Sequence, residues 1–538
     1  MFDYLQIGLS GITVANQSIY INGQNITKSD MPQYHRKTAR LSTLPNDNGV
    51  IYSYTHRETE DILQKLYYNN LSDFSFYDEL YNYHSLLESY LTIGDYVAKF
   101  NDIYNVLSQL TGSRYRINDL ISNMHDLVMS IRSTSDALDT LKINIEHQIT
   151  SYVEQINNYL TNLTRLDHNL LDNRDQILEH LSNIMNTNLV QTNKGINILS
   201  DNGLPLILDN TVYQLKIQYN NNNNINLVND IGTIDVDSGR LGSLIYMYNQ
   251  YIPKIKNEIN YLVSDFIRNI NQIQATGLGI AGEYESVDSR IAVPDVFAPL
   301  ATQDLPLEIF EGDITISITD INSSTRNNYT FHINPNIHSL YDISNFLSSL
   351  PGISASVNTS TGLISISALP GYKFDFAGRD TIPATNTPVA NPDTSGLLSA
   401  LGINGIFDGY NADTINLRQQ FIDNPNLFAF SKTGEIGNND NIIRLLDVFK
   451  SSLFTQNNFI QSMSKIITDI GNFGTTVTNS KNYSKEIYND TYTKLNEIIG
   501  VDTNEEFINL LKFQKMLEAS SKYISIVNQT IDTLLNMF

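Results

Sequence analysis

The chain has 538 residues, a hydrophobic content of 41% and a formal net charge of −23. That length suits three or four ordinary domains, and that apolar content supports real cores. The negative charge argues against a nucleic-acid binder and against attachment to an anionic membrane surface, because both need a basic face. The sequence has no Cys, which removes disulfides, thiolate metal ligands and Cys nucleophiles. The sequence contains no run of about 18 apolar residues, so we expect no membrane insertion.

The first 27 residues predict an amphipathic helix with one apolar stripe, because apolar residues recur at spacings of three and four. After Phe2, the stripe consists of Leu5, Leu9, Ile12, Ile19 and Ile26, with Asn16 and Gly23 in the remaining positions. The start of the chain lacks a basic segment and a continuous apolar core. We therefore expect no cleaved secretory signal peptide, so that export would need another route.

The segments after this helix predict a chain that returns to helix. Pro32 forces an extended exit, and residues 37–60, which have no clear period, predict an extended connector. From about residue 58 to 111 the pattern is helical and rich in Tyr. An apolar seam then runs through residues 115–186, and its length favours a coiled-coil-like arrangement over an ordinary globular bundle.

Strand and helix patterns alternate through the second half of the chain. Residues 187–238 combine short apolar runs with Asn-rich turns and predict a small β module with hairpins. Residues 241–275 predict a helix, and residues 280–410 predict a β-rich domain. In that domain Ile314, Ile316 and Ile318 alternate with polar residues, and residues 358–362 predict a hairpin turn. Residues 440–499 return to helix.

The C-terminus carries a second apolar stripe that matches the first. Its members are Leu510, Phe513, Leu517, Ile524, Val527, Ile531, Leu534 and Phe538, with Ser520 as the polar gap. A terminal helix with such a stripe needs a partner, and the opposite terminus is the first choice, followed by another copy of a similar chain. This pattern favours an assembling rod over an enzyme.

The predicted fold class is mainly α with β-rich insertions. Both termini would form a discontinuous coiled-coil-like helical shaft, from which the β domains project. We expect a terminal helical assembly domain of residues 1–45 and 500–538, and a helical shaft domain of residues 46–186, 240–280 and 425–499. A small β module would span residues 187–239, and one or more projecting β-rich domains would span residues 281–424.

The motifs that could carry chemistry have structural interpretations. Gly277, Gly279 and Gly282 match a dinucleotide-binding string, but they follow a predicted helix, so a flexible exit loop is the better interpretation. Asp235 and Asp237 lack the downstream calcium-loop spacing and predict a turn, with Ser238 as a possible helix cap. The charged run around Asp172, Arg174 and Asp175 predicts a solvated helix face. We expect no catalytic residues, cofactor or metal.

Two sets of motifs resemble the flagellar axial family of rod, hook and hook-associated proteins. The N-terminal set comprises Gly8–Ile12, Asn25–Ile26, Pro32, Tyr34 and Arg36. The interior set, Leu171, Asp172, Arg174 and Asp175, is similar to a motif of the hook-associated protein 1 group. One departure is Gln33, which stands where the family usually has Gly.

The resemblance implies a structural role, as the junction layer between the hook and the filament of the bacterial flagellum. It implies an extracellular location, with export through the flagellar type III route and without a cleaved signal peptide. The implied partners are identical subunits in a ring, the hook protein, the second junction protein (hook-associated protein 3), and an export chaperone at the C-terminal helix. The alternative function is a secreted adhesin or effector with a helical stalk, and a hydrolase in the β-rich insertion is a distant third.

Overall fold

The computed structural model describes residues 2–31, 33–44, 49–93, 95–111, 116–167, 170–192, 195–385, 388–434, 437–453 and 458–537. Within it the chain forms two compact units. The first unit comprises Met1–His84, Asn144–Gln250 and Gly474–Phe538. The second unit comprises Ser85–Ile143 and Tyr251–Phe473. Pro32 and Phe538 lie outside the described residues.

Long helices dominate the first unit. They are α1 (Phe2–Lys28), α2 (Asp61–Ile93), α4 (Ile117–Arg165), α5 (Leu171–Ile184), α6 (Gly239–Tyr246), α12 (Phe459–Ile499) and α13 (Thr503–Leu535), of which α2, α4 and α12 continue into the second unit. The predicted fold class, mainly α with β-rich insertions, is confirmed. The long seam of residues 115–186 belongs to α4 and α5, and its members Ile145, Ile149 and Ile156 are fully buried.

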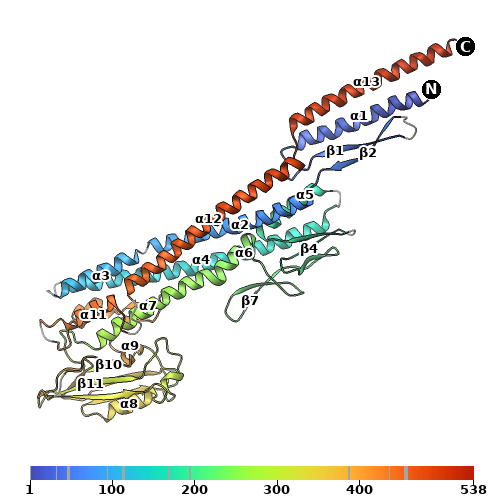
Figure 1. The fold of residues 1–538 in the computed structure, drawn as a ribbon. Coiled ribbons are helices and arrows are strands. Elements are labelled where there is room, and N and C mark those ends of the chain that lie inside the picture. The colour runs from blue at the N-terminus through green and yellow to red at the C-terminus, as the bar shows by residue number, and fades with distance from the viewer. Residues whose placement is uncertain are drawn as a thin grey trace. The chain divides into compact units, whose positions relative to one another are not determined.

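The two terminal helices α1 and α13 lie side by side and run antiparallel, so that the N- and C-termini meet at one end of the pair (Figure 1). The pairing of the two termini that the stripes predict is therefore confirmed. Strands β1 (Lys37–Thr43) and β2 (Val50–Arg57) form an antiparallel hairpin that also packs against α1.

This hairpin corrects the prediction of an extended connector for residues 37–60. A bulge between Arg40 and Leu41 shifts the register, and β1 is exposed on both faces from Arg40 to Thr43. A strand with two exposed faces has no reason to alternate apolar and polar residues, and it therefore leaves no period in the sequence.

The strands predicted for residues 187–238 are present, as two antiparallel sheets in the first unit. One contains β3 (Asn188–Thr192), β4 (Gly195–Leu199), β5 (Pro205–Leu208) and β6 (Thr211–Val212), and the other contains β7 (Lys216–Tyr219), β8 (Ile225–Val228) and β9 (Thr233–Ile234). Two helix asparagines hold this module. Asn157 of α4 bonds both the N–H and the C=O of Leu215, at 2.8 and 3.0 Å, and Asn249 does the same to Ile225 at 2.8 Å each.

Helix α7 (Ile252–Ala275) is the centre of the second unit. A π-helical turn, Met247–Tyr251, precedes it, at the point where Pro253 removes one helical N–H donor. Every residue from Asp265 to Ala275 is buried. Around α7 lie α9 (Leu397–Ala400), α11 (Asp440–Lys450) and strand β16 (Phe407–Asp408), and α3 (Tyr96–Leu110) packs on α11. The unit also contains β17 (Asn416–Leu417), α10 (Gln419–Asp423) and two short 3₁₀ turns, Leu300–Thr302 and Pro425–Leu427.

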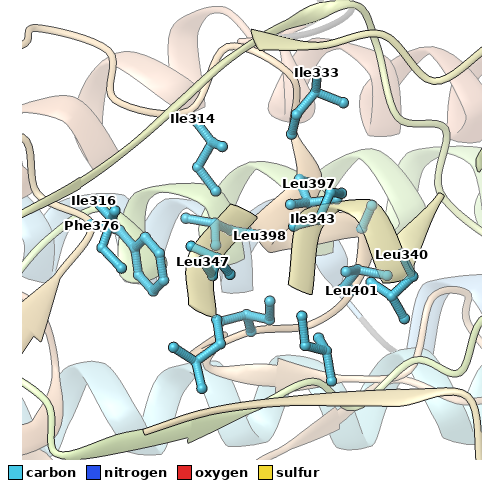
Figure 2. Packing of buried hydrophobic residues seen from close by; sticks show 14 of the residues in the cluster. Ile314, Ile316, Ile333, Leu340, Ile343, Leu347, Phe376, Leu397, Leu398 and Leu401 are labelled. Atoms are coloured by element: carbon cyan, nitrogen blue, oxygen red, sulfur yellow. The ribbon is translucent and has the colours of Figure 1, made fainter. Parts of the chain in front are cut away.

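Strands are present in the region predicted to be rich in β structure, where they form two three-stranded sheets. One orders β12 (Thr325–Ile333), β11 (Gly312–Asp320) and β15 (Tyr372–Asp375), and the other orders β10 (Ser286–Asp288), β14 (Leu363–Ala368) and β13 (Ile353–Asn358). Their apolar faces share one core with helix α8 (Leu340–Ser349), in which Ile314, Ile316 and Leu347 are buried (Figure 2). The turn predicted at residues 358–362 joins β13 to β14.

Three local predictions are corrected. Helix α8 interrupts the region expected to be strand, because Ser339 and Asp342 form a capping box ahead of an apolar helical face. The loop at Gly279 is held rather than flexible, since Leu278 and Ser431 exchange backbone hydrogen bonds of 2.7 and 3.3 Å. Ser238 occupies the N-cap position of α6, but its hydroxyl bonds Asp201 and caps no helix N–H. Among the described residues, no helix combines the length and apolarity that a membrane span needs.

Candidate assembly interface

A row of small residues forms the face of α1 that meets α13. We call this row the small-residue seam; it consists of Gly8, Gly11, Ala15, Ser18, Asn22 and Asn25, at alternating spacings of three and four. All six are buried. A Cβ placed on Gly8 would lie 2.5 Å from Ile524 Cγ1, and one on Gly11 would overlap the Ser520 hydroxyl. The absence of side chains at these glycines therefore sets how closely the two helices approach.

The predicted stripe of α1 lies beside this seam, displaced by one residue. Leu9 is 60% exposed. The other stripe members in the interface prediction are half-buried: Leu5, Ile12, Ile19 and Ile26. A method that counts large apolar residues finds the outward row and overlooks the seam, because glycine, alanine and serine carry little hydrophobic signal.

The predicted stripe of α13 has a different position, because it faces the seam. Ile524 and Ser520 meet Gly8 and Gly11, and the other members recur on the same helical face. Half-buried positions are Leu510, Phe513, Leu517, Ile524, Val527 and Ile531, and Leu534 is 36% exposed. Helix α13 also has large apolar residues outside the predicted stripe, which the sequence analysis did not identify. Each is more than half exposed: Phe507, Ile508, Leu511 and Ile526.

At the Asn25 end of the seam, polar groups join α13 to the N-terminal segment. We call Asn25, Tyr34, Arg36 and Glu506 the polar anchor. Asn25, fully buried, bonds the N–H and C=O of Lys37 at 3.0 and 2.8 Å, and it donates to Glu506 Oε2 at 3.0 Å. The Tyr34 hydroxyl donates to Asn25 Oδ1 at 2.9 Å. The amide of Asn25 thus uses two donors and two acceptor positions, which is its full capacity.

Glu506 is the buried residue of α13, with 1% of its surface exposed. Arg36 Nε donates to Glu506 Oε1 at 2.7 Å, and another Arg36 nitrogen donates to Glu505 at 2.7 Å. Burial, followed in effect by Asp172 and Glu506, raises the pKa of Tyr34 to about 12, so its hydroxyl keeps the proton that it donates. The polar anchor therefore holds α1, the start of β1 and the first turns of α13 together.

The backbone at Gln33 turns the chain ahead of Tyr34. Gln33 has a φ of 56°, in the left-handed region where glycine is most easily accommodated. Gln33 thus forms the turn that delivers Tyr34 to the polar anchor.

The charged run at the start of α5 forms a second cluster. Asp175 is 1% exposed, which corrects the prediction of a solvated face, whereas Asp172 and Arg174 remain partly exposed. Arg57 of β2 bonds Asp172 at 2.9 Å and Asp175 at 2.7 Å, and Arg174 bonds the other oxygen of Asp175. Leu171 is half-buried. The prediction failed because Arg57, the partner that makes burial of this carboxylate possible, is more than a hundred residues away in sequence.

His35 joins the two clusters. It is fully buried, its Nδ1 lies 2.7 Å from the Glu58 carbonyl, and its Nε2 lies 3.6 Å from Asp175. Burial first, and the nearby Arg57 second, lower the pKa of His35, so the ring is held neutral. Because both carboxylate oxygens of Asp175 accept arginine donors, this cluster fixes the hairpin to α5.

Comparisons with known proteins point in one direction. Residues 88–287 match the family model for the flagellar hook-associated protein FlgK helical domain. The chain is 22% identical over 582 residues to flagellar hook-associated protein 1 of Escherichia coli strain K12, with full coverage of both chains. It is likewise 22% identical over 578 residues to flagellar hook-associated protein 1 of Salmonella typhimurium strain LT2, again with full coverage of both. The solved flagellar hook junction protein FlgK of Burkholderia pseudomallei covers 80% of this chain and 99% of its own, at 13% identity and a TM-score of 0.46.

Proposed function

We propose that this chain, whose sequence is related over its full length to flagellar hook-associated protein 1, is a structural subunit of the bacterial flagellum at the junction between hook and filament. The full-length relation supports the role, and the terminal helix pair supplies a physical means of assembly. We also retain the division of the chain into terminal, shaft, small β and projecting β-rich parts as a proposal.

The apolar surface that the terminal pair leaves uncovered carries this proposal. Leu9 and Tyr20 of α1 are each 60% exposed, and Ile508 and Leu511 of α13 are 66% and 59% exposed. Soluble monomers rarely expose so many large apolar side chains on one pair of helices. Contact with neighbouring subunits would bury them, and each fully buried Leu or Ile contributes about 1.5–3 kcal/mol.

The proposed contacts assign different roles to the two predicted stripes. The outward stripe of α1, together with the outward residues of α13, would meet neighbouring subunits. The stripe of α13 would hold α1 within the subunit. We propose that the neighbours are copies of this chain in a ring, the hook protein and the second junction protein. A chaperone that holds the C-terminal helix before export without a cleaved signal is part of the same proposal.

Substitution of outward residues tests the proposal. In the bacterium that produces this chain, Leu9→Asp should leave the protein folded and exported but abolish its retention on isolated flagella. Filament subunits should then be lost to the medium. A strain that swims normally with Leu9→Asp, and retains the variant on its flagella, would contradict the proposal.

A matched control uses the same chemical change elsewhere. Ile443 of α11 is 47% exposed and lies in the second unit, outside the terminal pair. Ile443→Asp should be retained on flagella at the wild-type level. Retention is measured by quantifying the protein in purified flagella against the amount in the medium.

A further inference from the structure

Among the residues that the structure describes, four helix asparagines make the same contact, which we call the asparagine clamp. In each, the side-chain amide bonds both the N–H and the C=O of one residue in another segment. The pairs are Asn25 with Lys37, Asn157 with Leu215, Asn249 with Ile225, and Asn271 with Phe407, at distances of 2.8–3.0 Å. An amide held this way imitates a neighbouring strand, so each clamp docks a β segment onto a helix.

The clamp at Asn25 differs because it also reaches α13. Its second amide hydrogen goes to Glu506 Oε2 at 3.0 Å, and its oxygen also accepts the Tyr34 hydroxyl. When α13 is docked, Glu506 therefore orients the amide that holds Lys37, the first residue of β1. When α13 is displaced, a fully buried amide hydrogen and the Arg36 guanidinium lose their shared carboxylate acceptor.

The hairpin depends on such attachments, because a two-stranded sheet is marginal by itself. Asn25 holds its first strand, and the Ser10 hydroxyl of α1 accepts the N–H of Val50 at 3.2 Å. Near its base, Arg57 binds the carboxylates of α5. Leu41, Ile51 and Tyr54, farther from the base, are each more than 40% exposed.

We propose that Asn25 is a positioning residue that couples the hairpin to the C-terminal helix, so that docking of α13 through Glu506 orders β1 and β2. The coupling belongs to the terminal helix pair itself and does not rest on the junction role. It gives the chain a way to present the exposed hairpin residues in a fixed arrangement after its last helix is in place.

The absence of Cys from the sequence permits a clean test. A Cβ on Gly11 would lie 3.2 Å from Ser520 Cβ, a few tenths of an ångström short of the range of about 3.5–4.5 Å for a disulfide, so that a small shift of the two helices brings the pair into range. The double variant Gly11→Cys with Ser520→Cys, once oxidised, locks α13 onto α1 and replaces no residue of the polar anchor. Hydrogen exchange, followed by mass spectrometry, then reports order in residues 37–57 while α13 stays in place.

In this locked chain, Glu506→Gln should speed exchange in residues 37–57 by about tenfold, because a charge-assisted buried hydrogen bond is weakened. Exchange in residues 205–228, held by Asn157 and Asn249, should not change. Glu518→Gln is the matched control, because Glu518 is 72% exposed on the same helix. Wild-type exchange of the hairpin in locked Glu506→Gln would overturn the proposal.

A second comparison separates Asn25 from Arg36 as the route of coupling. In the locked chain that carries Asn25→Ala, adding Glu506→Gln should produce no further increase in hairpin exchange, because the coupling residue is already absent. A further increase of the same tenfold size would show that Arg36 carries the effect, and would also overturn the proposal.

Discussion

The terminal helix pair and the β-rich part of the second unit differ in the side chains that stabilise each of them. Around β11 and α8, large apolar side chains such as Ile316, Leu347 and Phe374 are almost completely buried. In the terminal pair, α1 contributes small residues to the contact, and the stripe of α13 is only half-buried. The β-rich region buries its large apolar side chains in its own core. The terminal pair leaves many of its large apolar side chains exposed, and its two helices are held by close approach and by the polar anchor.

The largest effect should follow from opening a cavity in the β-rich core. Phe374→Ala removes a fully buried ring that lies 5.9 Å from the ring of Phe376. We expect a loss of about 3–5 kcal/mol in the unfolding free energy of the second unit, measured by denaturant titration.

The control for this cavity is the same change at Phe297, which is 61% exposed and should cost far less. Hydrogen exchange in α1 and α13 should stay at the wild-type rate in both variants. Faster exchange in the terminal helices of Phe374→Ala would contradict the interpretation that the two regions are stabilised independently.

A smaller effect should follow from widening the small-residue seam. Gly11→Val places a branched side chain against Ser520, and overpacking of this kind costs about 1–3 kcal/mol. The expected result is faster hydrogen exchange throughout α1 and α13.

Gly23 gives the matched control within the same helix. A Cβ there meets nothing within 4 Å, so Gly23→Ala should stabilise α1 by about 0.5–1 kcal/mol through helix propensity. If Gly11→Val and Gly23→Ala behaved alike, close approach would not be what holds the pair.

The pH response should distinguish the regions by sign. The buried His35 has a pKa below its ordinary value of 6.5, so the unfolded chain binds its proton more readily. Its contribution to stability is therefore complete above about pH 6.5 and is lost as the pH falls through the folded pKa, with a slope of at most about 1.4 kcal/mol per pH unit. His35→Gln should flatten this part of the first unit's stability profile.

The exposed His332 of the second unit should respond in the opposite sense. Its partners Asp313 and Glu311 raise its pKa, so its contribution is present at low pH and is lost as the pH rises. Thermal unfolding of His332→Gln and His35→Gln from pH 5 to 8 measures both profiles. A slope of the same sign for the two histidines would contradict this interpretation.

The smallest effect concerns the turn that leads to the polar anchor. Because Gln33 has a φ of 56°, Gln33→Gly should stabilise the first unit by about 0.5–1 kcal/mol. Gln6→Gly, at an exposed position inside α1, should instead destabilise by a similar amount. Equal effects from the two glycines, measured by chemical denaturation, would remove strain at Gln33 as an explanation.

Most elements could be predicted from the sequence, because their periods survive in single segments. The long α4 seam and the turn at residues 358–362 are of this kind. The small-residue seam could not, because it has no large apolar side chain at regular spacing. Nor could the hairpin of residues 37–57, because β1 is exposed on both faces from Arg40 to Thr43 and a bulge after Arg40 shifts its register with β2. The roles of Glu506 and Arg57 could not be predicted for another reason. Each forms its ion pair with a residue that is distant in sequence, and a charged residue without a visible partner predicts a solvated surface.

The hydrogen bond between Asn25 and Glu506 joins residues 481 positions apart. Contacts between residues so distant in sequence form slowly, because the entropy of loop closure opposes them. Because α13 is synthesised last, the terminal pair can form only after the whole chain has left the ribosome. In an incomplete chain α1 has no α13 to pack against, so the exposed apolar surface of the terminal pair is assembled only when synthesis is complete.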